Sequence, residues 1–414
     1  PGRITWFAKS SGTTSDKSKF IPVSRASLSQ CHYRGGMDCA ASYLNNFPDS
    51  KVAHGKGLVL GGSHKSVADH RGIQTGDLSA ILIQNMNPVA NLFRTPGKNI
   101  ILKDEWEAKL EEICEKTYNQ RVTNLSGVPS WMLVLIKKML QKTGKSNLTE
   151  VWPHLEVFFH GGVSFAPYAQ QYKELIPSEK MRYMETYNAS EGFFSLQNDM
   201  ADPSMLLLLD YGIFYEFIPM EDIDSENPRI IPLADVELNK NYAIVISSCN
   251  GLWRYKIGDT VLFTSIRPYK IQITGRTRHY INVFGEELMV GNADLAIQKA
   301  SELTGAQVLE YTAAPVYMSS HSKGRHQWLI EFKEQPASIE AFTNALDAQL
   351  QSLNSDYEAK RYKNITLDKP EIIVAREGVF HDWLKEKGQL GGQHKVPRLS
   401  NSRTIIEEIL QLLS

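Results

Sequence analysis

The protein has 414 residues, which is enough for two or three domains and a large hydrophobic core. Hydrophobic residues make up 42% of the sequence and charged residues 22%, and this balance excludes a disordered, collagen-like or coiled-coil protein. The 45 basic and 46 acidic side chains give a formal net charge of -1. Because nucleic-acid-binding proteins are normally basic, we expect no nucleic-acid partner.

The sequence indicates neither a membrane-spanning segment nor a disulfide framework. The strongest apolar stretches, 131–136 and 205–209, are far shorter than the ~20 residues that a bilayer requires, so we expect no membrane partner. The four cysteines show no CxxC spacing, which favours buried free thiols in a reducing compartment. We therefore expect a cytoplasmic protein, with a monomer as the favoured state.

Apolar runs alternate with amphipathic segments over most of the chain. In order, the sequence predicts a strand at 56–60, helices at 105–118 and 130–143, and strands at 155–159, 206–209 and 243–247. Ser130 is the expected N-cap of the second helix, and Gly144 is its expected end. Strands that alternate with helices predict an α/β fold with buried sheets.

The pattern changes after residue 275. A helix at 292–304, strands at 308–312 and 327–332, a helix at 339–353 and a strand at 371–375 follow, which is a βαβ-like set. This set would form a compact domain of about 140 residues. The polar and basic stretch 274–279 is the expected linker. We therefore predict a large domain over residues 1–275 and a small domain over residues 276–414.

The first chemical motif is a polar loop near the start of the chain. It contains the hydroxyl and glycine residues Ser10, Ser11, Gly12, Thr13 and Thr14, and Lys19 closes it. Hydroxyls and exposed backbone N–H groups donate to phosphate oxygens, glycine allows a close backbone approach, and lysine adds positive charge. The run lacks the GxxxxGK[ST] spacing of a Walker A loop. It is either a phosphate-binding loop or a polar surface loop.

The second motif combines an aromatic ring with a carboxylate. Tyr187 is followed four residues later by Glu191. The ring can stack on a base, and the carboxylate can hold Mg²⁺, which takes few protein carboxylates and completes its shell with phosphate oxygens. The alternative is a strand end with an incidental acid.

Three later motifs add polar groups beside glycine. Asp259 follows Gly258, and a carboxylate there can accept hydrogen bonds from a ribose diol. Arg276 follows Gly275 at the expected domain junction, and Lys395 follows a glycine-rich run near the C-terminus. Each is also compatible with an ordinary turn. The order of the five motifs is more informative than any one of them.

This order resembles the adenylate-forming enzymes, which include acyl-CoA synthetases and luciferases, and within them the Gretchen Hagen family of acyl-acid amido synthetases. Residues 251–259 read Gly-Leu-Trp-Arg-Tyr-Lys-Ile-Gly-Asp and are similar to the family's Gly-Leu-Tyr-Arg-Tyr-Arg-Val-Gly-Asp. Residues 393–398 read Gln-His-Lys-Val-Pro-Arg and are similar to its Gln-Tyr-Lys-x-Pro-Arg. The first loop has one more residue before its lysine than the usual acyl-CoA synthetase loop.

There are also departures from the family pattern. Ser15 and Asp16 stand where glycines are usual, and His160-Gly161-Gly162 replaces a different small-residue motif of the plant enzymes. Family members carry a segment before the phosphate loop that this sequence does not contain, so we expect the first segment of the large domain to be absent.

The resemblance implies a large N-terminal domain of mixed sheets flanked by helices, and a small α+β lid that swings about a hinge near 276–278. Lys19 and the loop residues Ser10, Ser11, Gly12, Thr13 and Thr14 would hold the phosphates of ATP. Gly161 and Gly162 would lie beside the adenine and the acyl carboxylate, and Tyr187 would stack on the adenine. Ser190 would lie near the phosphate, and Glu191 would bind Mg²⁺. Asp259 would bind the ribose, Arg276 would bind ribose or phosphate, and Lys395 would reach in from the small domain.

The implied reaction joins a small carboxylic acid to an amino acid through an acyl-adenylate, with release of AMP and pyrophosphate. Two alternatives remain: an acyl-CoA synthetase that uses a thiol acceptor, and an inactive nucleotide-binding module. His160 and His394 are candidate bases toward the amine. One helix could wall the acyl pocket, through Trp131, Met132, Val134, Leu135, Ile136 and Met139.

Overall fold

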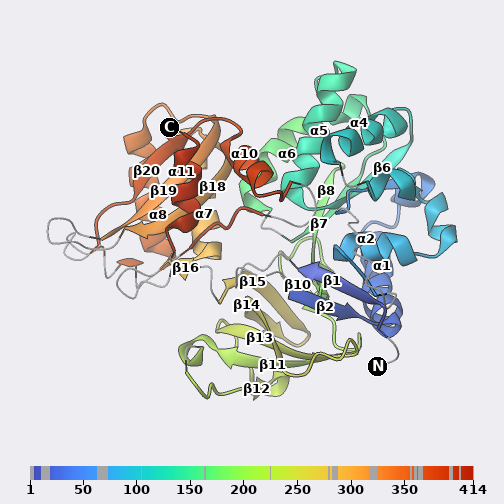
Figure 1. The fold of residues 1–414 in the computed structure, drawn as a ribbon, viewed down its shortest axis with the longest axis horizontal. Coiled ribbons are helices and arrows are strands. Elements are labelled where there is room, and N and C mark those ends of the chain that lie inside the picture. Colours follow the sequence, from blue (N-terminus) through green and yellow to red (C-terminus); the bar gives the residue numbers. More distant parts are fainter. Residues whose placement is uncertain are drawn as a thin grey trace.

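The structure is a computed structural model with a mixed α/β fold, in which a large sheet-rich N-terminal domain is followed by a smaller C-terminal domain (Figure 1). This confirms the predicted fold class. The described residues are 4–10, 19–62, 73–103, 105–162, 165–223, 225–277, 280–281, 288–316, 324–354, 357–358, 361, 367–390, 395–400 and 402–413.

The chain begins with a hairpin that forms its own small sheet. Strand β1 (Trp6–Ser10) pairs antiparallel with β2 (Lys19–Val23) and parallel with β4 (Gln74–Gly76). The helical segments around it are η1 (Ser27–Tyr33), α1 (Arg34–Asn46), η2 (Val52–His54), α2 (Leu78–Asn85), η3 (Pro88–Leu92) and α3 (Lys98–Ile101).

One half of the twelve-stranded sheet is parallel. In spatial order its strands are β5 (Arg94–Thr95), β3 (Lys56–Val59), β6 (Val122–Gly127), β7 (Val157–Gly161) and β8 (Arg182–Ala189). The helices that pack with it are α4 (Trp106–Thr117), α5 (Pro129–Thr143) and α6 (Ala169–Leu175), joined by the short turns η4 (Leu148–Glu150) and η5 (Ala166–Tyr168). Because the strands are parallel, the carboxyl ends of β6, β7 and β8 lie at one edge, where ligands bind in such sheets.

The other half of the sheet is antiparallel. It continues from β8 through β9 (Gly192–Leu196), β10 (Met205–Leu207), β15 (Tyr269–Arg276), β14 (Tyr255–Ile266), β13 (Asn241–Ser248), β11 (Ile213–Pro219) and β12 (Ile231–Pro232), with turns η6 (Met220–Asp222) and η7 (Leu233–Asp235). An aromatic core that includes Phe194, Tyr215, Phe217 and Phe263 fills this half.

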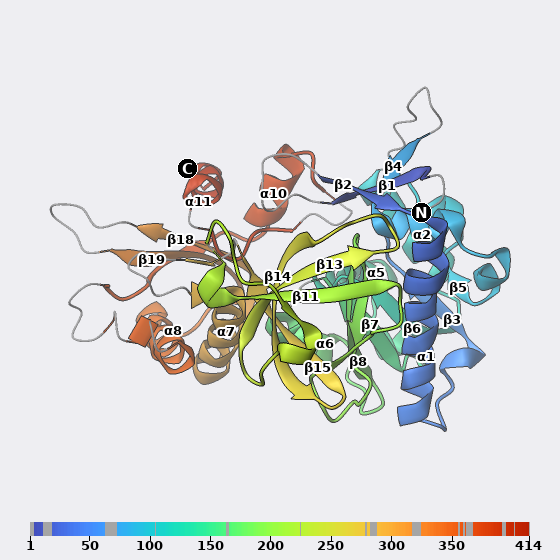
Figure 2. The ribbon, with the colours of Figure 1, turned by 90° about the horizontal axis from the view of Figure 1, so that it is seen from below.

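The small domain is built on a three-stranded sheet. Its elements are β16 (Tyr280–Ile281), β17 (Leu288–Met289), α7 (Val290–Thr304), β18 (Gln307–Val316), β19 (Arg325–Glu334), α8 (Ile339–Leu353), β20 (Glu371–Ala375), α10 (Val379–Glu386) and α11 (Thr404–Gln411). Strands β19 and β20 are parallel and are connected through α8, so the predicted βαβ set is confirmed. Figure 2 shows α7 and α8 at one end of the molecule and α1 at the other.

Helix α10 brings the small domain against the large one. Its residues Phe380 and Trp383 belong to the same apolar cluster as Trp131 and Leu135 of α5. Figure 1 shows α10 between the sheet of the small domain and the helices α5 and α6. The two domains are therefore packed together around their junction.

Most predicted elements are confirmed, but the start of α5 is not. The helix begins at Pro129 and its N-cap is Val128, so the prediction that Ser130 caps it is wrong. Proline is favoured at the first helical position because it has no N–H to leave unpaired. Gly144 ends the helix at φ 66°, as predicted.

Three further predictions concern the cysteines, membrane-spanning segments and the domain boundary. The cysteines Cys31, Cys39, Cys114 and Cys249 are free, as expected. Within the described residues, no helix is long and apolar enough to cross a membrane. The predicted domain boundary at residue 275 falls within the end of strand β15 and stays a prediction, since residues 278–279 and 282–287 lie outside the described part of the chain.

Candidate functional site

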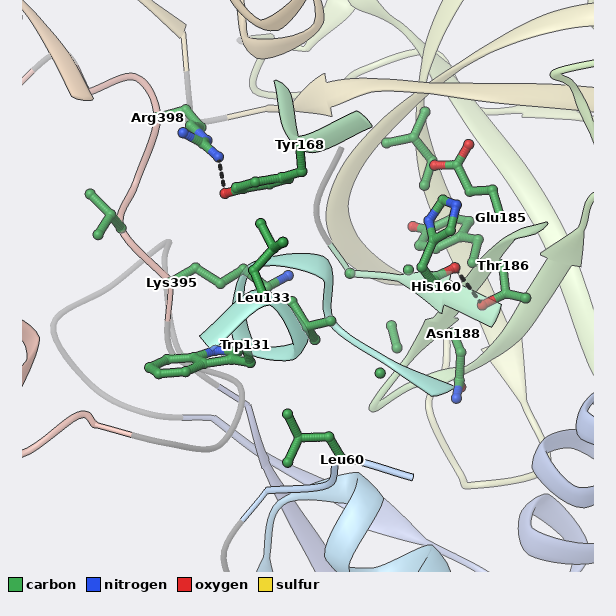
Figure 3. A pocket seen from close by; sticks show the side chains of 18 of the residues that line it. Leu60, Trp131, Leu133, His160, Tyr168, Glu185, Thr186, Asn188, Lys395 and Arg398 are labelled. Carbon is green, nitrogen blue, oxygen red and sulfur yellow. Dashed lines mark hydrogen bonds between the residues drawn. The ribbon is translucent and has the colours of Figure 1, made fainter. Parts of the chain in front are cut away.

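A cavity of about 1230 Å³ lies between the two domains. It is larger than the roughly 300–1,000 Å³ of a site for one drug-sized molecule. The large domain lines it with the ends of β7 and β8, with β14 and β15, and with α5, and the small domain contributes residues 395–398 (Figure 3). The cavity therefore has room for a nucleotide together with a second substrate.

Eight of the residues predicted for ATP, Mg²⁺ or catalysis line this cavity. They are Lys19, Gly161, Gly162, Tyr187, Ser190, Glu191, Asp259 and Lys395. Four others, Ser11, Gly12, Thr13 and Thr14, lie outside the described residues. Ser10 and Arg276 are placed through their backbone, in β1 and in β15.

The ends of the predicted phosphate loop are held by strand pairing. Ser10 and Lys19 are register partners across β1 and β2. The Lys19 ammonium lies 5.4 Å from the centre of the Tyr255 ring, where a cation is attracted by the aromatic face. Lys19 is thus presented to the cavity from the end of a strand.

Glycines at the end of β7 allow two close approaches. A Cβ on Gly161 would lie 2.3 Å from the backbone oxygen of Thr186 in β8, which is a severe clash. Gly162 has φ +82°. A Cβ on Gly162 would lie 3.3 Å from the Lys395 Nζ atom, so the small-domain lysine is seated against this glycine. Figure 3 shows Lys395 pointing into the cavity from the small-domain side.

Tyr187 and Asp259 are directly bonded. The Tyr187 hydroxyl donates to Asp259 Oδ2 at 2.6 Å, and both side chains are buried. The Tyr187 ring packs against Phe194 with ring centres 4.8 Å apart. Asp259 is the register partner of Arg276 across β14 and β15. This bond was not predicted, and it brings three of the sequence motifs to one place.

Ser190 and Glu191 form the turn between β8 and β9. Both are buried, and the Asn250 amide donates to the Glu191 backbone oxygen at 3.3 Å. Within the described residues, no group of three or more His, Cys, Asp or Glu side chains could hold a metal ion. Glu191, one of the carboxylates that line the cavity, fits Mg²⁺, because this ion takes one or two protein carboxylates and shares the phosphates of its substrate.

The predicted acyl wall is only partly in the cavity. Trp131 and Val134 line it, together with Leu133 of the same helix, whereas Met132, Leu135, Ile136 and Met139 are fully buried in the core. Trp131 packs edge-to-face on Trp106, with ring centres 4.9 Å apart. These two indoles form an apolar floor on which the acyl part of a substrate could lie.

His160 and Glu185 are neighbours at the far side of the cavity. They are register partners on β7 and β8, and Figure 3 shows them side by side, across the cavity from Lys395. Burial lowers the pKa of His160 to about 3, so this imidazole is neutral and a poor base toward an ammonium group. Burial raises the pKa of the Glu185 carboxyl to about 7. His394, the other candidate base, lies outside the described residues.

Several cavity residues were missed by the sequence reasoning. Glu185 precedes Tyr187 by two positions, so strand alternation could have placed both on one face. Asn188 accepts a hydrogen bond from His32 Nδ1 at 3.0 Å, and burial lowers the pKa of His32 to about 4, which keeps that ring neutral. Tyr168, which bonds Arg398, has no signal in the sequence.

The comparison with known structures defines the class of fold. An acyl acid amido synthetase solved with 2,4-DB superposes with a TM-score of 0.78 at 16% identity, covering 99% of this chain and 82% of that one. A 2-hydroxyisobutyryl-CoA ligase in the postadenylation state gives a TM-score of 0.59 at 12% identity, covering 99% and 76%. The fold is therefore that of the adenylate-forming ligases.

The sequence comparison then gives the family. Residues 1–181, 206–276 and 291–404 match the GH3 family N-terminal, central and C-terminal domains, so the chain belongs to the GH3 (Gretchen Hagen) family. Indole-3-acetic acid-amido synthetase GH3.3 of Arabidopsis thaliana is 26% identical over 335 residues, which is 74% of this chain and 56% of the relative. Jasmonoyl–L-amino acid synthetase GH3.5 of Oryza sativa subsp. japonica is 28% identical over 252 residues, or 55% and 42%.

The curated relatives are longer proteins. This chain spans about half the length of the curated relatives it matches, for example 56% and 54% of the Arabidopsis thaliana synthetases GH3.3 and GH3.4. The 4-substituted benzoates-glutamate ligase GH3.12 of Arabidopsis thaliana, 25% identical over 340 residues, is matched over 57% of its length. Family membership rests on the three domain matches over residues 1–181, 206–276 and 291–404.

The pKa of Glu185 gives a stability prediction. Since burial disfavours its ionised form, the native state is penalised as pH rises from about 4.3, the unfolded value, to about 7, and the penalty is constant above that. We expect Glu185→Gln to remove a penalty of up to about 3 kcal/mol at about pH 8 and almost none below about pH 4. Chemical unfolding at both pH values measures this.

The control is Glu179→Gln, which changes an exposed carboxylate close in sequence. Its effect on the free energy of unfolding should be small and the same at both pH values. If Glu185→Gln also has the same effect at both, the Glu185 carboxyl does not titrate in the way its burial requires.

Proposed function

We propose that the protein is an acyl-acid amido synthetase that activates a carboxylic acid with ATP and transfers the acyl group to an amino acid. The observation that carries the proposal is the position of the Lys395 ammonium against Gly162, in a cavity that also receives Lys19, Glu191 and Asp259. Lys19 and Lys395, which come from different domains, thus share the cavity with two buried carboxylates, Glu191 and Asp259. Family membership supports the same activity.

In the first half-reaction, the carboxylate oxygen of the acid attacks the α-phosphorus of ATP and pyrophosphate leaves. The nucleophile is already ionised, so no general base is required. Negative charge increases on the phosphoryl oxygens, and Lys19 and Lys395 would stabilise it. Mg²⁺ held by Glu191 would act as a Lewis acid on the same oxygens.

The adenosine part has its own partners. Asp259, fixed by the Tyr187 hydroxyl, would accept hydrogen bonds from the ribose, and Arg276 is its register partner. Gly161 and Gly162 would lie beside the adenine and the acyl carboxylate, with Ser190 near the phosphate. By resemblance, we assign the loop residues Ser10, Ser11, Gly12, Thr13 and Thr14 to the phosphates of ATP.

In the second half-reaction, the amine attacks the acyl carbon, AMP leaves and an amide forms. We place the hinge for a domain movement between the halves at about 276–278, which would exchange the residues that face the acyl-adenylate. The free cysteines support a reducing compartment such as the cytoplasm.

A panel of acids tests this function. Indole-3-acetate, 4-hydroxybenzoate and jasmonate are offered with ATP and Mg²⁺, and pyrophosphate release is measured with glutamate, with glycine, with lysine or with CoA as the acceptor. An amide identified by mass spectrometry supports the proposal. A CoA thioester would instead indicate an acyl-CoA synthetase, and the absence of acid-dependent pyrophosphate exchange over a broader panel would indicate an inactive nucleotide-binding module.

Lys395→Ala should slow acid-dependent pyrophosphate exchange by about 10²–10³-fold, the usual scale for one electrostatic stabiliser. The matched control is Lys387→Ala, because Lys387 is a half-exposed small-domain lysine that pairs with Glu408 at 2.7 Å and does not line the cavity. An exchange rate unaltered by Lys395→Ala, with the acid substrate still bound, would remove this residue from the adenylation step.

Asp259→Ala should weaken ATP binding while the fold stays intact. The carboxylate accepts a bond from Tyr187 and would accept others from the ribose, and charge-assisted hydrogen bonds contribute roughly 1.5–3 kcal/mol each, so the Kd for ATP should rise by at least about 10-fold. Calorimetric titration with ATP measures this. Asp222→Ala, which alters an exposed pair with Arg229, is the control. Equal ATP affinity in both variants would refute the ribose role.

A further inference from the structure

Arg398 is held by a buried cluster inside the small domain. Its guanidinium bonds Glu310 of β18 and lies 3.9 Å from Asp294 of α7. It also lies 4.5 Å from the centre of the Tyr311 ring, and its side chain is 11% exposed. Two carboxylates therefore balance the charge of Arg398 within its own domain.

The same guanidinium reaches across to the large domain. Arg398 Nη2 donates to the Tyr168 hydroxyl oxygen at 2.5 Å, as Figure 3 shows. Tyr168 ends the turn η5 and is buried. Burial raises the pKa of this phenol, so it remains a neutral partner at physiological pH.

The segment that carries Arg398 also carries Lys395. The Thr312 hydroxyl donates to the Pro397 oxygen at 2.7 Å, and the Ala313 N–H donates to the Arg398 oxygen at 2.9 Å. These bonds fix the segment to β18, so its position follows that of the small domain. Fixing Arg398 to the large domain therefore fixes where Lys395 enters the cavity.

Other contacts between the domains lie away from this segment. The Gln171 amide donates to the Val308 oxygen at 3.1 Å, and Glu174 pairs with Lys333 at 3.3 Å and accepts from Gln307. Gln171, Glu174, Gln307 and Lys333 do not line the cavity. They hold the same two domains together without touching the lysine segment.

We propose that Tyr168 and Arg398 are positioning residues that seat Lys395 against Gly162 for the adenylation half-reaction and release it for amide transfer. This rests on the proposed function. Because Glu310 and Asp294 keep the charge of Arg398 balanced, separating the domains breaks a hydrogen bond to a neutral phenol and leaves no unpaired buried charge. Such a contact can open and close in every turnover.

The test separates the two half-reactions. In Tyr168→Phe, the ring stays and the hydroxyl is lost. We expect pyrophosphate exchange with indole-3-acetate to fall roughly 10-fold, the effect of one charge-assisted hydrogen bond. Amide formation from synthetic indole-3-acetyl-adenylate and glutamate should change by less than about 2-fold, because Lys395 has then left the site. Arg398→Lys keeps the charge beside Glu310 and should likewise slow pyrophosphate exchange while leaving amide formation nearly unchanged.

Glu174→Gln is the matched control, because it alters a domain contact whose two charged side chains are about a third exposed, and such an ion pair contributes little to holding the domains together. It should leave both half-reactions unchanged. An equal loss in both halves for Tyr168→Phe, or no loss in either, overturns the positioning role.

A second measurement does not depend on activity. Small-angle X-ray scattering of the wild-type protein, of Tyr168→Phe and of Glu174→Gln reports how far the domains separate. Tyr168→Phe should give a larger radius of gyration than wild type and Glu174→Gln, and equal values overturn the proposal. If the wild-type protein exchanges no pyrophosphate with any acid of the panel while Tyr168→Phe still expands, the proposed function is contradicted and the contact is supported.

Discussion

The hydrogen bond from Tyr187 to Asp259 joins the two halves of the large sheet over the cavity. Tyr187 lies on β8, the last parallel strand, and Asp259 lies on β14 in the antiparallel half. Three strands separate them in the sheet, so the sheet must curve for the two side chains to meet. Glu191 lies in the turn that follows the strand of Tyr187, and Arg276 is the register partner of Asp259, so this bond joins the two segments that carry these residues.

Secondary structure was largely predictable because it depends on local patterns. The spacing of apolar residues gave α4, α5, α7 and α8 to within one or two residues. The wrong N-cap at Ser130 arose because hydroxyl residues are common caps, while the proline before it is favoured one position into a helix. Local sequence preferences are compatible with a helix that begins at either position, and in the structure it begins at Pro129.

The candidate site was predictable only where a motif is local. Motif order placed Glu191, Asp259 and Lys395, and each lines the cavity, while the roles of these residues stay predictions. The contact of Tyr168 with Arg398 joins residues that are 230 positions apart. No periodicity or spacing in one sequence encodes such a pair, since it exists only when the two domains are docked. Contacts between domains therefore cannot be predicted from the patterns of a single sequence.

The pairing of Ser10 with Lys19 has a consequence for how the loop between them can vary. Lys19 belongs to the strand β2, so its position is set by the ladder with β1 and not by the loop. Insertions between these two residues lengthen the connection without displacing the ammonium group, because closing a longer loop costs little. A hairpin of this kind separates evolutionary change in loop length from the placement of the charge, which is consistent with a loop one residue longer than that of the acyl-CoA synthetases.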